Sequence, residues 1–260
     1  MLAIAFIGTI QHEVAADVTR KLVDKIRAEA NCSCVVACNA NGLFATATKL
    51  DKQLEMLFDS GIDLVMVGEQ AISRNSCRSV FAKGQLPLLK PINLAGSTED
   101  KSIKKIMLEG CELCFISAVD GTSKVPVEHS YIKLDEFLRN KSKDSVVIIN
   151  ESGTDYKYLS ALAWRYSKLG GCLLILGSGT GEATRMLSCF GEKCCLQCDV
   201  GSVVVEDTIC GIEPEKWWSK NIDRRPLTLL PKWGSLRCDY TMVWVNERRI
   251  EKYCSKSVRM

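Results

Sequence analysis

The sequence predicts an α/β fold with a mostly parallel sheet, and three observations favour it. Short apolar runs of strand length alternate with amphipathic stretches of helical length over residues 2–83. A second round of strand, helix and strand covers residues 146–176. Residues 226–253 then alternate apolar and polar side chains, which is typical of a terminal antiparallel hairpin. A βαβ rhythm places parallel strands side by side with helices on the faces of the sheet.

The first half is predicted to supply three buried strands and three helices. The first helix is indicated by Val14, Val18, Leu22 and Ile26, which recur every four residues and so share one face. The second helix ends at Gly61, because glycine readily adopts the left-handed conformation that closes a helix. In chain order the expected elements are a strand at 2–8, a helix at 13–30, a strand at 34–38, a helix at 50–60, a strand at 63–68 and a helix at 69–83.

The middle of the chain is less regular. The segment LPLLKPINL at residues 86–94 contains two prolines and is expected at the edge of a sheet. A polar, lysine-rich stretch separates it from the strand CELCFISAV at residues 111–119. Residues 125–140 are expected to form a loop and a short helix, and 146–149, 156–169 and 172–176 a strand, a helix and a strand. Without a repeat or a low-complexity linker, the whole of residues 1–260 is predicted to form a single domain.

Composition excludes several classes of protein. The net charge is +3 and no basic block is present, so dedicated nucleic-acid binding is not expected. The opening run MLAIAFIG is too short for a membrane span and lacks the basic start of a signal peptide, so we expect a cytoplasmic protein with no membrane association.

The chain is cysteine-rich, with fourteen cysteines and two histidines. Without an export signal these cysteines are expected as reduced thiols. Two pairs have the C-x-x-C spacing of zinc sites, Cys111 with Cys114 and Cys195 with Cys198. Both lie in strand-like stretches, where residues three apart point to opposite faces, so zinc is disfavoured. A histidine-rich metal centre cannot be assembled from His12 and His129, although His12 could contact an anion near a helix start.

The stretch GGCLLILGSGTGEATRML at residues 170–187 has the glycine-rich pattern of a nucleotide loop that opens a helix. It would suit a protein that binds S-adenosylmethionine. Two features weaken that interpretation. The strand ends in Ile175 and Leu176 instead of the acidic residue such proteins carry, and the last part of the remaining chain is predicted to be a meander.

Segments spread over nearly the whole chain share one resemblance. They are FIGTI (6–10), CNANG (38–42), SGIDLVMVGEQ (60–70), LLKPINL (88–94), residues 115–121, ALAWRYSKLGG (161–171), GSGTG (177–181), CDVGSVV (198–204) and ICGIEPE (209–215). In order and spacing they resemble the small bacterial calcineurin-like metallophosphoesterases of the YmdB type, which act on 2′,3′-cyclic nucleotides. The resemblance implies a metallophosphoesterase-like α/β sandwich, two metal ions at the carboxyl ends of its strands, and a tendency to form oligomers.

The metal-binding and catalytic residues of that family are mostly replaced in this chain. The positions that match them are Thr9, Ala40, Asn41, Glu69, Gln70, Gly179 and Gly181. Thr9 stands for an aspartate, Glu69 and Gln70 for an Asn-His pair, and the two glycines for the histidines of a G-T-H-T-H loop. Ala40 and Asn41 stand for a Glu-Asn pair. A further histidine falls at 151–152, where the chain has Glu and Ser.

These losses predict a pseudoenzyme that acts by binding or assembly, forms a homo-oligomer, and needs no cofactor. Two cations close together require a dense set of carboxylates and imidazoles. Candidate residual ligands are Asn41, Glu69, Glu151 and Asp199. The alternative is a phosphodiesterase that holds one divalent cation through Glu69 with Glu151 and Asp199.

Each carboxylate also has a simpler interpretation than a metal ligand. Glu69 is then a residue at the start of a helix, Glu151 a carboxylate in a surface loop, and Asp199 a hydrogen-bonding residue in a turn. A phosphate or a nucleotide is the candidate ligand. Trp217 and Trp218 indicate an apolar face, for which core or subunit contacts are favoured over nucleobase stacking.

Overall fold

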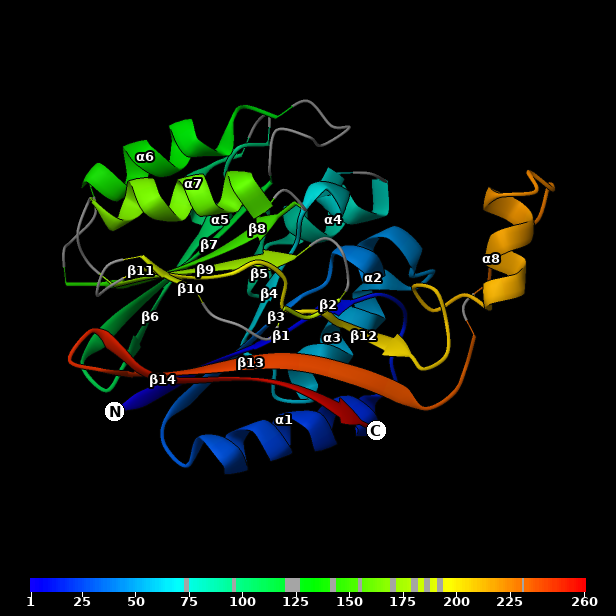
Figure 1. Cartoon of the computed structure of the whole chain (residues 1–260), viewed down its shortest axis with the longest axis horizontal. Coiled ribbons are helices and arrows are strands. Elements are labelled where there is room, and N and C mark those ends of the chain that lie inside the picture. Colours follow the sequence, from blue (N-terminus) through cyan, green and yellow to red (C-terminus); the bar gives the residue numbers. More distant parts are fainter. Residues whose placement is uncertain are drawn as a thin grey trace.

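The structure, a computed structural model, is a sandwich of two β-sheets with helices on both outer faces (Figure 1). It describes residues 1–72, 75–94, 97–119, 127–140, 144–153, 156–168, 172–178, 182–184, 188–190, 194–230 and 232–260. The predicted α/β sandwich, with mostly parallel strands and a terminal antiparallel hairpin, is confirmed.

The first sheet has the strand order β2-β12-β13-β1-β3-β4-β5, and β14 pairs with β13. Its strands are β1 (Leu2–Ile7), β2 (Thr9–Ile10), β3 (Cys34–Asn39), β4 (Leu64–Met66), β5 (Leu88–Leu89), β12 (Ser202–Val205), β13 (Leu236–Asn246) and β14 (Arg249–Arg259). Strands β1, β3, β4 and β5 run parallel, whereas β13 is antiparallel to β1 and to β14. The predicted hairpin is therefore β13 and β14.

The second sheet has the order β10-β11-β9-β8-β7-β6. Its strands are β6 (Ile103–Leu108), β7 (Cys111–Val119), β8 (Val146–Ser152), β9 (Cys172–Ser178), β10 (Ser188–Phe190) and β11 (Cys194–Gln197). The four central strands are parallel, and β6 and β10 add antiparallel edges.

The helices complete two outer layers. They are α1 (Ala16–Ala30), α2 (Asn41–Thr46), α3 (Leu50–Asp59), the 3-10 helix η1 (Glu69–Ile72), α4 (Asn75–Lys83), α5 (Glu99–Ser102), α6 (Ser130–Asn140), α7 (Tyr156–Ser167) and α8 (Pro214–Asn221). Helices α1 and α3 pack on the first sheet, and α6 and α7 pack on the second. None of the described helices combines the length and apolar character needed to cross a bilayer.

Alternation along the strands builds three apolar layers. On β1, Leu2, Ile4 and Phe6 face the second sheet, whereas Ala3, Ala5 and Ile7 face α1 and α3. On β8, Val146 and Ile148 face the first sheet, and Val147 and Ile149 face α6 and α7. Each large side chain buried in this way contributes about 1.5–3 kcal/mol.

Several elements differ from the sequence predictions. The lysine-rich stretch contains strand β6, where Lys104 and Lys105 are exposed at the edge of the sheet. The helix predicted over 69–83 begins as η1 and continues as α4, with residues 73–74 outside the described part. Helix α8 was not predicted, and it buries none of its residues.

Candidate functional site

The face between the two sheets changes from apolar to neutral polar where the parallel strands end. Inward positions carry Ala37 and then Asn39 on β3, Ile148 and then Asn150 on β8, and Leu176 and then Ser178 on β9. Carboxyl ends of parallel strands share one edge of a sheet, so residues distant in sequence meet here. The inward residues at this end of the parallel strands include Gly8, Asn39, Gly68, Ser117, Asn150, Ser152 and Ser178.

Asn39 is the centre of a hydrogen-bond network that joins the two sheets. Its Nδ2 donates to Ser178 Oγ at 2.8 Å and to Asn150 Oδ1 at 3.4 Å, and Ser178 Oγ donates to Asn150 Oδ1 at 3.2 Å. Its Oδ1 accepts from the backbone N–H of Asn41 at 2.7 Å. All three network side chains are buried. Both ends of the Asn39 amide are therefore used within the protein.

Asn41 orders the turn that follows β4. Its Oδ1 accepts from the backbone N–H of Gly68 at 3.1 Å and of Gln70 at 3.0 Å. A Cβ on Gly68 would lie 2.3 Å from Ser152 Oγ and 3.1 Å from Asn41 Cγ, so these residues are in tight contact. Ala40 joins β3 to β4, since its N–H donates to Met66 O at 2.9 Å. The Asn41 oxygen proposed as a metal ligand thus already holds two backbone groups.

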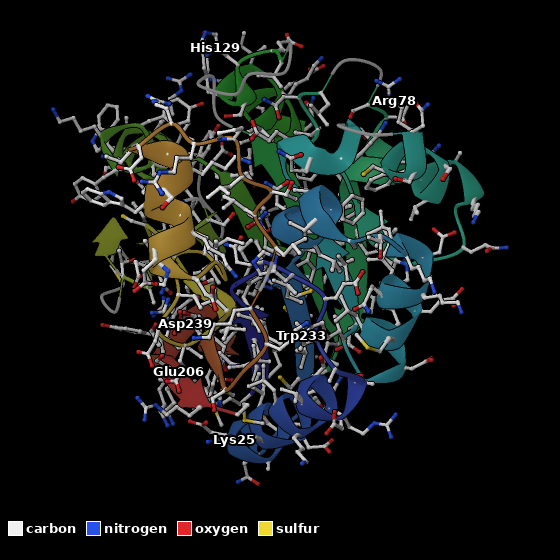
Figure 2. All side chains as sticks on the ribbon, turned by 90° about the vertical axis from the view of Figure 1, so that its right-hand side faces the viewer. Lys25, Arg78, His129, Glu206, Trp233 and Asp239 are labelled. Atoms are coloured by element: carbon white, nitrogen blue, oxygen red, sulfur yellow. The ribbon has the colours of Figure 1, made fainter. Side chains whose placement is uncertain are left out.

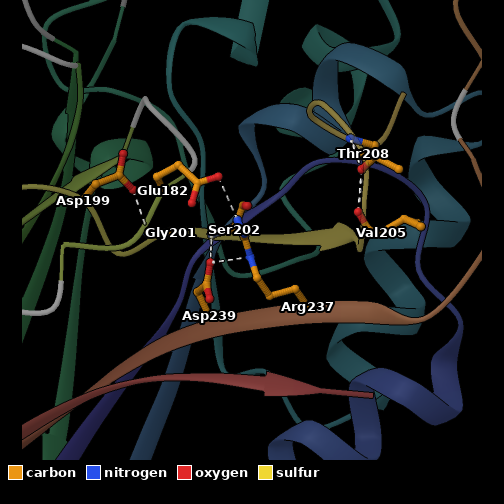
Figure 3. A network of polar contacts seen from close by, with 9 residues as sticks. Glu182, Asp199, Gly201, Ser202, Val205, Thr208, Arg237 and Asp239 are labelled. Atoms are coloured by element: carbon orange, nitrogen blue, oxygen red, sulfur yellow. Dashed lines mark hydrogen bonds and ion pairs between the residues drawn. The ribbon is translucent and has the colours of Figure 1, made fainter. Parts of the chain in front are cut away.

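Two buried carboxylates hold the turn before β12 (Figure 3). Asp199 Oδ1 accepts from Gly201 N at 2.7 Å, and Asp239 Oδ2 accepts from Ser202 N at 3.0 Å. Arg237 contacts Asp239 at 3.3 Å and Glu182 at 3.2 Å. Hydrogen bonding to the turn is the role expected for Asp199.

Thr9 lies against the same turn. Its N–H donates to Gly201 O at 2.8 Å, and β2 pairs with β12 there. A Cβ on Gly8 would lie 2.4 Å from the Gly201 backbone. Close backbone approach therefore explains the glycine beside Thr9.

Glu151 faces the other side of its strand. It is fully buried, and its Oε1 accepts from Ser130 Oγ at 2.7 Å; Ser130 Oγ lies 2.6 Å from Tyr158 Oη. Burial, and then the negative charge of Glu151, raise the pKa of the nearby Tyr166 hydroxyl. The interpretation of Glu151 as a surface loop carboxylate is wrong: β8 runs through Ser152, and alternation turns Glu151 toward α6 and α7.

Glu69 begins η1 next to the network of Asn39, Asn150 and Ser178, here called the neutral cluster. Gln70 Nε2 lies 3.4 Å from its Oε1. In the described part of the chain no three His, Cys, Asp or Glu side chains gather as a metal-binding group. The trio Glu69, Glu151 and Asp199 is therefore not assembled.

The sequence profile of the YmdB-like protein family matches residues 5–253. The chain belongs to this family. Its structure is similar to a hypothetical protein from Thermus thermophilus, with a TM-score of 0.83, 19% identity and 99% of each chain covered. It is also similar to a novel phosphatase from Mycoplasma pneumoniae, with a TM-score of 0.79, 13% identity, and 100% of this chain and 93% of that chain covered.

A more distant likeness is to a putative 5′-nucleotidase from Staphylococcus aureus, crystallised with alpha-ketoglutarate. The TM-score is 0.60 at 9% identity, and 98% of this chain and 54% of that chain are covered. No curated protein matches the chain. The fold is thus that of metallophosphoesterase-type phosphatases and nucleotidases.

Other predicted site residues lie apart from the cluster or outside the description. Gly179 and Gly181 fall outside the described residues. His12 Nε2 lies 2.6 Å from Cys210 O, and burial lowers the pKa of the ring. Trp218 is exposed on α8 and donates through Nε1 to Asp223 at 3.1 Å.

The sequence analysis missed the residues that form the network in this YmdB-like chain. Asn39 and Ser178 end β3 and β9, and Asn150 lies two residues before the end of β8; none of the three stands at a position that matches a metal ligand of the family. The sequence does indicate which way they face. Each lies two residues after an inward apolar side chain on the same strand, and residues two apart on a strand share a face. Asp239 and Arg237 lie on β13, whose antiparallel course brings the start of that strand to this edge.

Proposed function

We propose that this YmdB-like protein keeps the metallophosphoesterase fold, has lost the two-metal site, and acts by binding or assembly. One observation carries the proposal: the side chains that meet at the carboxyl ends of β3, β8 and β9 are amides and hydroxyls that bind one another.

These residues do not fit a pair of divalent cations. Such a pair needs several anionic or imidazole ligands to offset its charge, and neutral amide and hydroxyl oxygens supply none. The Asn41 oxygen accepts two backbone N–H groups, and the Asn39 oxygen accepts one. A cation would have to displace these bonds, each of which contributes about 0.5–1.5 kcal/mol.

Hydrolysis assays test the proposal. Purified protein is incubated with 2′,3′-cyclic nucleotides and with each of Mn²⁺, Fe²⁺ and Mg²⁺. We expect no turnover above the protein-free rate, since no activated hydroxide forms without a suitable site. Turnover that a chelator abolishes would reject the pseudoenzyme.

The second candidate is a phosphodiesterase with one oxygen-ligated cation at Glu69. The position of Glu69 beside the cluster, at the start of η1, favours it. Under this alternative Glu69→Ala abolishes both Mg²⁺ binding and hydrolysis and leaves the fold intact. If the variant and the wild-type protein are equally inactive, the single-cation enzyme is rejected.

Assembly is supported by an exposed apolar surface on α8 and the segment after it, here called the α8 surface. It consists of Trp218, Ile222, Leu230 and Trp233, whose exposed fractions are 57%, 51%, 69% and 75%. Helix α8 stands at the margin of the molecule, and Trp233 lies on the same end (Figures 1 and 2). Exposed apolar patches rich in tryptophan are typical of interfaces, so we propose a second copy of this chain as its partner.

A further inference from the structure

Two thiols face each other across the edge of the second sheet. Cys189 on β10 is directly opposite Cys195 on β11 in the antiparallel register. Their Sγ atoms are 3.0 Å apart. Directly opposite residues in an antiparallel pair have Cα atoms about 4.5–5.5 Å apart, which lies within the range that a disulfide spans. The register and the short Sγ–Sγ distance therefore place the two thiols within reach of each other.

The two thiols differ in access. Cys195 is buried and contributes to the apolar layer between the sheets, whereas Cys189 is exposed on the edge strand. Of the thirteen cysteines whose exposure is described, only Cys189 and Cys210 are exposed. A reagent from solution therefore reaches Cys189 first, and Cys195 lies within reach of the product.

We propose that Cys189 and Cys195 form a thiol-modification site, at which small-molecule disulfides are exchanged for an intramolecular disulfide. The Cys189 thiolate attacks a disulfide RSSR; an S–S bond to Cys189 forms and one RS⁻ leaves. The Cys195 thiolate then attacks Cys189 Sγ and expels the second RS⁻. The two protein thiols are oxidised, RSSR is reduced to two RSH, and the two protons from the cysteines end on the RSH molecules.

The bond would fasten β10 to β11. Strand β10 lies between β9 and β11 along the chain. Beyond β11 the chain enters the Asp199 turn, which contacts Thr9 through Gly201. Along the chain, the two cysteines therefore lie between Ser178 of the neutral cluster and the Asp199 turn.

Oxidised glutathione is the probe, and peptide mass spectrometry is the readout. The native protein is incubated with the probe, remaining thiols are blocked, and trypsin is added without reductant. Cleavage after Lys193 puts Cys189 and Cys195 on different peptides, so only a disulfide holds them together. Fragment spectra distinguish Cys195 from Cys194 and Cys198. In wild type we expect the Cys189–Cys195 link, and glutathione retained only on Cys210.

Two variants and one control make the outcome decisive. In Cys195→Ser, glutathione is expected to remain on Cys189, because the resolving thiol is gone. In Cys189→Ser, the buried Cys195 stays unmodified. Cys194→Ser is the matched control: its Sγ donates to Ala163 O at 3.3 Å on the opposite face, so the link persists. Equal unfolding midpoints of the reduced proteins verify the fold.

Glutathione retained on wild-type Cys189, or an unreacted Cys189 beside a modified Cys210, would overturn the proposal.

Discussion

At the residue scale, the proposal for this YmdB-like protein rests on neutral side chains at the carboxyl ends of the strands. Asn39 donates to Ser178 and Asn150 and accepts from Asn41 N. A carboxylate there would lose the donor and place a charge in the buried interface between the sheets. The same network, which we propose leaves no place for a cation, joins the two sheets.

The nearly isosteric change Asn39→Asp tests this role. We expect the free energy of unfolding at pH 7 to fall by about 2–4 kcal/mol, because the new charge is buried without a counter-charge. The loss should shrink in acid, where the new carboxyl group takes up a proton. Urea denaturation across pH measures both effects.

Asn246→Asp is the matched control for that experiment. Asn246 donates to Glu251 in the exposed hairpin turn, so its replacement should change stability by no more than about 0.5 kcal/mol. If the two variants lose equal stability, or if Mn²⁺ stabilises Asn39→Asp strongly, the network does not have the role described.

At the element scale, close backbone contacts hold turns against the ends of strands, as where Gly8, after β1, packs on Gly201 in the turn before β12. A Cβ on Gly8 would lie 2.4 Å from backbone atoms of Gly201, which cannot move aside as a side chain can. We expect Gly8→Ala to lower the free energy of unfolding by about 1–3 kcal/mol. Gly84→Ala is the comparison: its Cβ would meet nothing within 4 Å, and only its φ of +62° adds strain. A larger loss in Gly84→Ala than in Gly8→Ala, by thermal or urea unfolding, would contradict this account.

Glu29 links the end of α1 to β13 and β14. Burial raises the pKa of its carboxyl group, but the Lys256 ammonium and the Tyr240 hydroxyl, which donates at 2.9 Å, outweigh burial and lower the pKa below 4.5. The ionised Glu29 carboxylate therefore stabilises the folded state above pH 4.5. This stabilisation is lost as the pH falls through the lower pKa of the folded state. Because the pair is partly exposed, it contributes less than about 1 kcal/mol.

Glu29→Gln should therefore be less stable than wild type at pH 7, and the difference should close in acid. Chemical denaturation at a series of pH values measures it. A difference that stays constant from pH 7 to pH 3 would show that the carboxylate charge has no part in the contact.

Much of the fold follows from local patterns, whereas much of the site does not. Apolar runs such as LAIAFI and CVVACN predict buried strands, and the four-residue spacing from Val14 to Ile26 predicts α1. The neutral cluster depends on how the two sheets pack on each other, which brings together residues over a hundred positions apart, as in the hydrogen bond between Asn39 and Asn150. Glu151 and Ser152 could not be separated without knowing where β8 ends, because a shift of one residue exchanges their faces.

At the scale of the whole molecule, the α8 surface is an apolar feature that a monomer leaves uncovered. We expect Trp218→Ser with Trp233→Ser to convert an oligomer into a monomer in sedimentation velocity. Trp164→Ser is the matched control, since Trp164 on α7 is 58% exposed, close to the 57% of Trp218. A monomeric wild-type protein, or dissociation by Trp164→Ser alone, would exclude the α8 surface as the contact.

The central claim concerns metal, and elemental analysis of the purified protein tests it most directly. The protein is loaded with Mn²⁺, Fe²⁺ and Zn²⁺, passed through a desalting column, and its metal content is measured by inductively coupled plasma mass spectrometry. We predict far less than one equivalent of any ion per chain, because the amides and hydroxyls at the strand ends bind one another. Two tightly held equivalents per chain would contradict the account.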